Sequence, residues 1–158
     1  MVFVLVSAVV FAQQYTLTVN ITGIKSIKGE IYVYLYTSED GFPIKISKAN
    51  SFKKAKVISN TVTMYFENLK TGTYAVSVYQ DIDTNGKINQ NFIGIPKEPV
   101  GVSNNAEGFM GPPRYEDAKF NLDSNKTIEI KLSKEWFLNP NWLKRDDRKN
   151  IDQRIYKG

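Results

Sequence analysis

Residues 30–36 of the chain, EIYVYLY, decide the fold class. Ile31, Val33 and Leu35 alternate with three tyrosines, and a period of two places the aliphatic and the aromatic side chains on opposite faces of a β-strand. Because tyrosine rings are largely apolar, both faces of this strand should be at least partly covered. The stretch therefore predicts a β-strand that packs on two sides.

The same alternation recurs along the chain. Residues 15–21, YTLTVNI, place Leu17, Val19 and Ile21 on one face. Further strands are expected at residues 62–66, 74–79, 118–122 and 127–132, with turn signals at Gly72 and at residues 123–125. One short helix is expected within residues 43–56. Short strands, frequent turns and the lack of a long segment with a 3.6-residue period predict an all-β fold, an antiparallel β-sandwich of about seven strands.

The composition fits a single domain, which we expect to span residues 13–133. The chain has 158 residues, of which 42% are hydrophobic and 13% aromatic. Residues 13–133 carry 14 Lys and Arg against 12 Asp and Glu, whereas residues 134–158 carry 7 against 4. The net charge of +5 therefore belongs largely to the tail, where Asp146 and Asp147 interrupt the basic residues. This pattern lacks the continuous positive field that binds phosphates, and we predict no nucleic-acid partner.

The chain contains no histidine and no cysteine. It therefore cannot build a Ser-His-Asp triad, a thiolate nucleophile, a disulfide, or a zinc or iron site that needs these side chains. The remaining metal ligands are oxygen atoms of Asp, Glu, Asn and the backbone. Such ligands suit calcium or magnesium.

The first 12 residues, MVFVLVSAVVFA, form an uncharged apolar run. The run is too short for a transmembrane helix, which needs about 20 apolar residues, and no other segment supplies one. It is typical of the apolar core and cleavage site of a signal peptide, although the usual positive start is missing, as in a truncated signal peptide. Cleavage after Ala12 would place the mature protein in the periplasm or outside the cell. The alternative is a buried first strand.

The C-terminal tail, residues 134–158, contains both tryptophans, Trp136 and Trp142, with several aliphatic residues. Two interpretations remain open. The tail packs on its own domain, or it docks on a partner, since aromatic and Arg side chains are enriched at interface hot spots.

Residues 79–96, YQDIDTNGKINQNFIGIP, carry most of the polar chemistry. One interpretation is a two-residue β-hairpin turn at Asn85-Gly86, because both residues tolerate a positive φ. In that register Asp81 and Asp83 would share a face with apolar side chains, so neither face is clean enough to fix the pairing.

The second interpretation is a calcium loop. Asp81, Asp83 and Asn85 occupy the first, third and fifth positions of a D-x-D-x-N-G pattern, and Gly86 makes the sharp turn. Lys87 would offer its carbonyl, and Asn89 falls on the ninth position. The twelfth position is not the bidentate glutamate of an EF-hand, so the last ligand must come from elsewhere. The candidates are Glu98, Glu107, Glu116 and Asp117, and our predicted metal set uses Glu98.

A long segment, residues 94–118, follows without obvious secondary structure. Connections of this length are uncommon inside compact domains and are usually functional or disordered. Its interleaved apolar residues argue against disorder. We expect a ligand-binding loop or a plain proline-stiffened crossover, and the candidate ligand residues are Ser103, Asn104, Asn105, Arg114, Tyr115 and Glu116.

Several of these motifs occur together in one known family. The segments NLKTGTYAVSVYQDIDTNGKINQNFIGIPKEPVGVSNN and GPPRYEDAKFNL resemble the bacterial family called domain of unknown function 2141, over roughly residues 15–132. The resemblance implies a small exported β-sandwich, prealbumin-like or immunoglobulin-like, with no established activity. Family members commonly carry His immediately before the first Asp and an acidic residue after Asn-Gly-Lys-Leu. This chain has Gln80 and Asn89 there, and the lost carboxylate weakens a calcium site.

Two classes of function follow from these observations. The first is a non-catalytic exported module, stabilised by calcium, that binds a glycan or a protein of the envelope or the surroundings. The alternative is a small hydrolase acting on glycans, in which Asp81 or Asp83 pairs with Glu98 or Glu116, because glycoside hydrolysis needs two suitably spaced acids.

Overall fold

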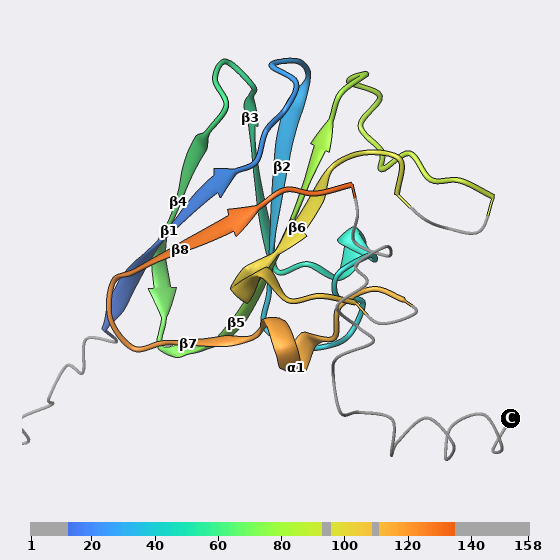
Figure 1. The fold of residues 1–158 in the computed structure, drawn as a ribbon. Helices are drawn as coiled ribbons and strands as arrows, with labels where there is room; N and C mark the ends of the chain where they lie inside the picture. Colours follow the sequence, from blue (N-terminus) through green and yellow to red (C-terminus); the bar gives the residue numbers. More distant parts are fainter. Residues whose placement is uncertain (1–12, 93–95, 109–110, 135–158) are drawn as a thin grey trace, which may run out of the picture.

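The computed structural model describes residues 13–92, 96–108 and 111–134, and these residues form a two-layered β-sandwich (Figure 1). One sheet has the order β4-β1-β8, and the other has the order β3-β2-β5-β6, with β7 also paired to β5. The strands are β1 (Gln14–Thr22), β2 (Glu30–Tyr36), β3 (Ser51–Lys56), β4 (Val62–Lys70), β5 (Gly72–Asp81), β6 (Val100–Val102), β7 (Phe120–Leu122) and β8 (Lys126–Lys131). The predicted all-β sandwich is confirmed. The signal peptide expected at residues 1–12 and most of the tail, residues 135–158, lie outside the described residues.

The two sheets enclose the main core. Ile31, Val33 and Leu35 of β2 are buried on the inner face, as the alternation predicts, and Leu17 and Val19 of β1 face them from the other sheet. Pairing of two inner faces in this way buries every second residue of each strand.

The outer face of β2 and β5 is buried as well, which confirms the prediction of cover on both sides. Tyr34, Tyr36, Tyr79 and Val100 form a second apolar cluster there. Tyr79 stacks on Tyr32, with ring centroids 4.9 Å apart. The connections around β3 and β6 supply the cover, which includes Phe42, Ala49, Ile88 and Tyr115.

One strand pair departs from the antiparallel expectation. β1 and β8 run parallel, with Leu17 opposite Lys126 and Ile21 opposite Ile130. After β7 pairs with β5, the chain turns through residues 123–125 and enters the other sheet in the direction of β1. Alternation along a strand carries no information on its direction, so the sequence pattern could not distinguish the two arrangements.

Two segments differ from their expected structure. Within residues 43–56, where one short helix is expected, the chain forms the 3₁₀ turn η1 (Ile46–Lys48). The same segment also contains the edge strand β3. The connection at residues 94–118 contains β6, the 3₁₀ turn η2 (Ser103–Asn105) and the short helix α1 (Tyr115–Ala118). Among the described residues, no helix is long and apolar enough to cross a membrane.

Candidate metal centre

The loop after β5 begins where the pairing between β2 and β5 ends, at Asp81 opposite Glu30. The two-residue hairpin at Asn85-Gly86 does not form, so that interpretation is wrong. Positive φ angles occur at Thr84 (58°) and Gly86 (75°) but not at Asn85, whereas the hairpin turn needs them at both central residues. The chain instead makes a wider loop and returns through an isolated bridge between Gln90 and Pro96.

The loop brings three carboxylates together. Oxygen atoms of Asp81, Asp83 and Glu98 lie within 4.8 Å of one another. Asp81 is the last residue of β5, and Glu98 lies just before β6, which pairs with β5. The pairing continues beyond β6, because the Gln80 N–H donates to the Pro99 carbonyl at 2.9 Å. The register of these two strands therefore places Glu98 beside Asp81.

Two of the three carboxylates are buried. Asp81 is 0% exposed, and Glu98 is 4% exposed. Asp81 accepts the N–H groups of Asn85 (3.1 Å) and Gly86 (2.7 Å). Glu98 accepts the N–H groups of Ile82 (2.9 Å) and Asn89 (3.1 Å). The two side chains thus fix the conformation of the loop by accepting four of its backbone N–H groups.

These hydrogen bonds bring no positively charged side chain to the group. Among the described residues, no Lys or Arg nitrogen lies within 4.0 Å of Asp81, Asp83 or Glu98. Lys97 lines the same open depression and makes no ion pair with them. Buried charges are costly unless an opposite charge or a metal ion balances them, so this group of carboxylates favours a bound cation.

Asp83 is the exposed member of the group. It accepts the side-chain amides of Asn89 and Asn85, each at 2.9 Å. The hydrogen bond from Asn89 is the main reason that the pKa of Asp83 is lowered, and the Asn85 backbone N–H adds to it. Asp83 therefore remains ionised at neutral pH and contributes a full negative charge to the group.

The other predicted metal ligands lie on the same loop. The Asn85 amide donates to the Asn89 side-chain oxygen at 3.0 Å, so both amides border the carboxylates. Lys87 lies between them, and its N–H donates to the Asn85 side-chain oxygen at 2.8 Å. Of the four candidates for the last ligand, the described structure brings only Glu98 into the group. Glu116 pairs with Lys119 (2.6 Å) and Asp117 with Arg114 (2.9 Å), both around α1.

The predicted ligand loop uses its first three residues to fix the chain. Buried Ser103 donates its hydroxyl to the Ala118 carbonyl at 2.6 Å and accepts the Val76 N–H at 2.9 Å. Asn104 donates to the carbonyls of residues 117 and 119. Asn105, with a φ of 46°, accepts the Lys131 N–H at 2.8 Å and so covers the open edge of β8.

The remaining predicted ligand residues lie on or next to α1. The side chains of Arg114 and Glu116 are 64% and 62% exposed, and Tyr115 packs edge-on against Phe42. Ligand binding by this loop stays a prediction. The six residues do not form one cluster of free polar groups, because Ser103, Asn104, Asn105 and Tyr115 hydrogen-bond to the backbone and Arg114 and Glu116 form ion pairs.

A comparison with family models gives one match, to the family described as "Uncharacterized protein conserved in bacteria (DUF2141)", over residues 19–131. The matched region includes both sheets and all three carboxylates. Comparisons with curated proteins and with solved structures give no match.

Proposed function

The chain belongs to the DUF2141 family of bacterial proteins, and we propose that it is a non-catalytic β-sandwich module that calcium stabilises at Asp81, Asp83 and Glu98. We further propose that the module is exported to the periplasm or secreted, and that it binds a glycan or a protein partner there. The observation that carries the calcium proposal is the convergence of the three carboxylates, two of them buried, with no positive side chain of the described residues paired to them.

Calcium fits this group better than other common ions. Its ligands are oxygens in an irregular loop, and calcium accepts variable geometry and mixes carboxylates with amide and backbone oxygens. Magnesium needs a nearly ideal octahedron, and zinc prefers nitrogen or sulfur ligands, which this chain lacks. On binding, the side-chain amides of Asn85 and Asn89 can rotate to present their oxygens in place of their nitrogens.

Export supports a weak calcium site. The apolar run at residues 1–12 is typical of a signal peptide. Calcium sites of extracellular modules work at dissociation constants of about 10⁻⁴ to 10⁻³ M. A group with three carboxylates and no bidentate glutamate at the twelfth loop position suits that range.

The alternative function is glycan hydrolysis by paired carboxylates. Such enzymes hold their two acids about 5–9.5 Å apart, so that a sugar and a water fit between them. In this chain the carboxylate oxygens lie within 4.8 Å, and each buried one accepts two backbone N–H groups. These hydrogen bonds hold both buried carboxylates against the backbone of the loop, which favours an ion as the occupant over a sugar and a water.

The proposal is tested by thermal unfolding with calcium and with a chelator. Calcium at a hundredfold over its dissociation constant adds about 2.7 kcal/mol to the free energy of unfolding, which raises Tm by roughly 10 °C for a domain of this size. Asp83→Asn should abolish the rise, because it removes an exposed charged ligand while its remaining oxygen still accepts the neighbouring amides. Asp81→Asn is less suitable, since Asp81 accepts two backbone N–H groups within the fold.

The matched control is Asp123→Asn. Asp123 is exposed in the turn before β8, away from the three carboxylates, so this variant makes the same charge change and should keep the full rise. Equal Tm values with chelator and with about 100 mM calcium, a hundredfold over the weakest dissociation constant expected, would rule out the site. The carboxylates would then serve only to hold the loop.

A further inference from the structure

An apolar groove lies on the outer face of the sheet β3-β2-β5-β6. Its walls include Pro43, Ile44, Ile46, Tyr79, Ile88 and Val100. Ile44 and Ile46 are 47% and 39% exposed, although apart from Ser77 and Gln90 the residues that line the groove are apolar or aromatic. A surface of this kind exposes apolar area to water unless another segment covers it.

The floor of the groove contains an unpaired polar atom. The hydroxyl of Tyr79 is buried, and although the side chain of Tyr34 lies beside it, the two make no well-formed hydrogen bond. Buried hydroxyls are nearly always hydrogen-bonded in folded proteins. The groove therefore combines an apolar surface with a polar group that lacks a partner.

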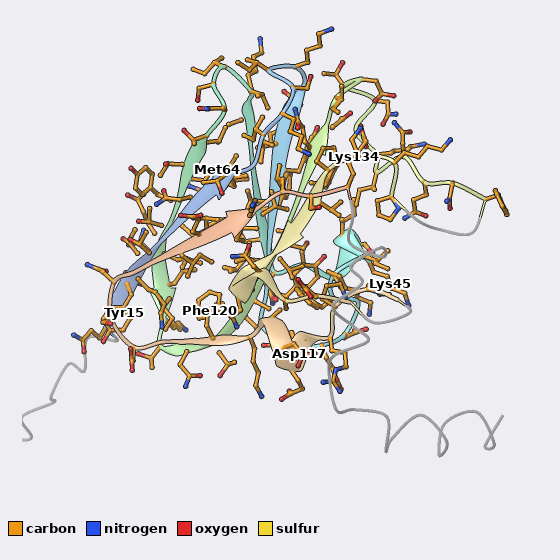
Figure 2. All side chains as sticks on the ribbon, in the orientation of Figure 1. Tyr15, Lys45, Met64, Asp117, Phe120 and Lys134 are labelled. Carbon is orange, nitrogen blue, oxygen red and sulfur yellow. The ribbon has the colours of Figure 1, made fainter. Side chains whose placement is uncertain are left out.

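The described part of the chain ends beside this groove. After β8 the Leu132 N–H donates to the Thr22 carbonyl, and Ser133 then pairs with Val100 through two hydrogen bonds of 2.9 and 3.0 Å. Val100 is itself a wall of the groove. In Figure 2, Lys134 and Lys45, which lies between Ile44 and Ile46, both appear on the right-hand side of the molecule.

The residues that follow are strongly apolar. Trp136, Phe137 and Leu138 come directly after Lys134 and Glu135. Three residues span at most about 10 Å, so Trp136 can reach the groove from Ser133 without a long linker. A short linker also gives the segment a high effective concentration at a neighbouring surface.

We propose that residues 136–138 of the tail cover the apolar groove of their own chain, with the Trp136 ring over Ile44 and Ile46. The indole buries the exposed isoleucines and provides an N–H that the Tyr79 hydroxyl can accept. This proposal does not depend on the calcium site.

Tryptophan fluorescence tests the proposal directly, because both tryptophans lie in the tail. The full chain with Trp142→Phe has Trp136 as its single reporter. Its emission maximum should lie at a shorter wavelength in the native protein than in denaturant, and acrylamide should quench it less. Adding Ile44→Lys and Ile46→Lys should move both quantities to their values in denaturant, while far-UV circular dichroism stays unchanged.

The control is the pair Ile27→Lys and Ile58→Lys, at two exposed isoleucines outside the groove, which should leave the Trp136 emission unchanged. If the first double variant folds poorly, Ile46→Lys alone serves. Native emission equal to that in denaturant would overturn the proposal, as would equal emission from the two double variants. Emission that depends on protein concentration would assign the groove to the tail of a second copy and would overturn it too.

Discussion

Asp83 differs from the other two carboxylates of the site because its side chain is exposed. The hydrogen bond from Asn89 lowers its pKa in the folded protein below the value in the unfolded chain. A group of this kind stabilises the fold above its unfolded pKa, and that stabilisation is lost as the pH falls through the lower, folded pKa.

We therefore expect an acid-sensitive contribution from Asp83 when a chelator removes calcium. As the pH falls from about 5 to about 3, the Tm of the wild type should fall more than the Tm of Asp83→Asn, because only the wild type loses the contribution of this carboxylate. The change should be small, since solvent screens an exposed group. Thermal unfolding across this pH range measures it, and a difference that stays constant would contradict the assignment.

Single residues explain how much of the site could be predicted. The spacing of Asp81, Asp83 and Asn85 within one short segment identified the loop, because a calcium loop uses alternate residues. Glu98 was one of four candidates. It reaches the site through the pairing of β5 with β6, and no local spacing encodes that pairing.

β6 is a strand of only three residues that packs closely against β8 of the other sheet. A Cβ atom at Gly101 would lie 2.7 Å from the Ile130 side chain and 3.0 Å from the Lys131 carbonyl oxygen. Real Cβ contacts are almost never this short, so a methyl group there must push β6 and β8 apart.

We expect Gly101→Ala to lower the free energy of unfolding by roughly 1–3 kcal/mol, the usual cost of overpacking. Gly72→Ala in β5 is the control, because its nearest neighbour would be the Tyr74 ring at an ordinary 3.5 Å. Denaturant unfolding of the two variants measures the difference. Equal midpoints would show that β6 adjusts without cost.

Two strands were not predicted because their sequences lack a signal. β3 (SFKKAK) is an edge strand whose residues are nearly all exposed, so no apolar alternation develops along it. Its lysines are typical of edges that avoid pairing with other chains. β6 (VGV) is too short for any period to appear.

We expect the loop that carries Asp81, Asp83 and Glu98 to open as a local unit while the sandwich stays folded. Lys87 and Lys97 lie on it and are exposed. Under the calcium proposal the ion binds the closed loop only, so it should slow tryptic cleavage after both residues by up to about a hundredfold at a hundredfold over its dissociation constant.

Mass spectrometry of the fragments with calcium and with chelator measures this protection. Cleavage after Lys70, at the distant end of β4, is the internal control and should not change. Asp83→Asn should remove the protection. Protection at Lys70 equal to that at Lys87 would indicate that calcium stabilises the whole domain and not the loop.

The alternation of apolar residues predicts the layered fold, but it does not predict which strands are neighbours. Alternation in β1 and β2 shows which residues face a core, and two such strands with short connections require two layers. It does not show that β8 lies parallel to β1, because the partner strand is at the other end of the domain.

The parallel pairing of β1 with β8 also bears on when the domain can fold during its synthesis. β1 is synthesised first, and its neighbour on one side is the last strand of the domain. Until β8 has left the ribosome, the sheet β4-β1-β8 lacks a strand and the core lacks Ile130. Contacts between the two ends of a chain form slowly. We therefore expect the sandwich to close only after synthesis of the domain is complete, and until then the growing chain can still be threaded through a narrow pore.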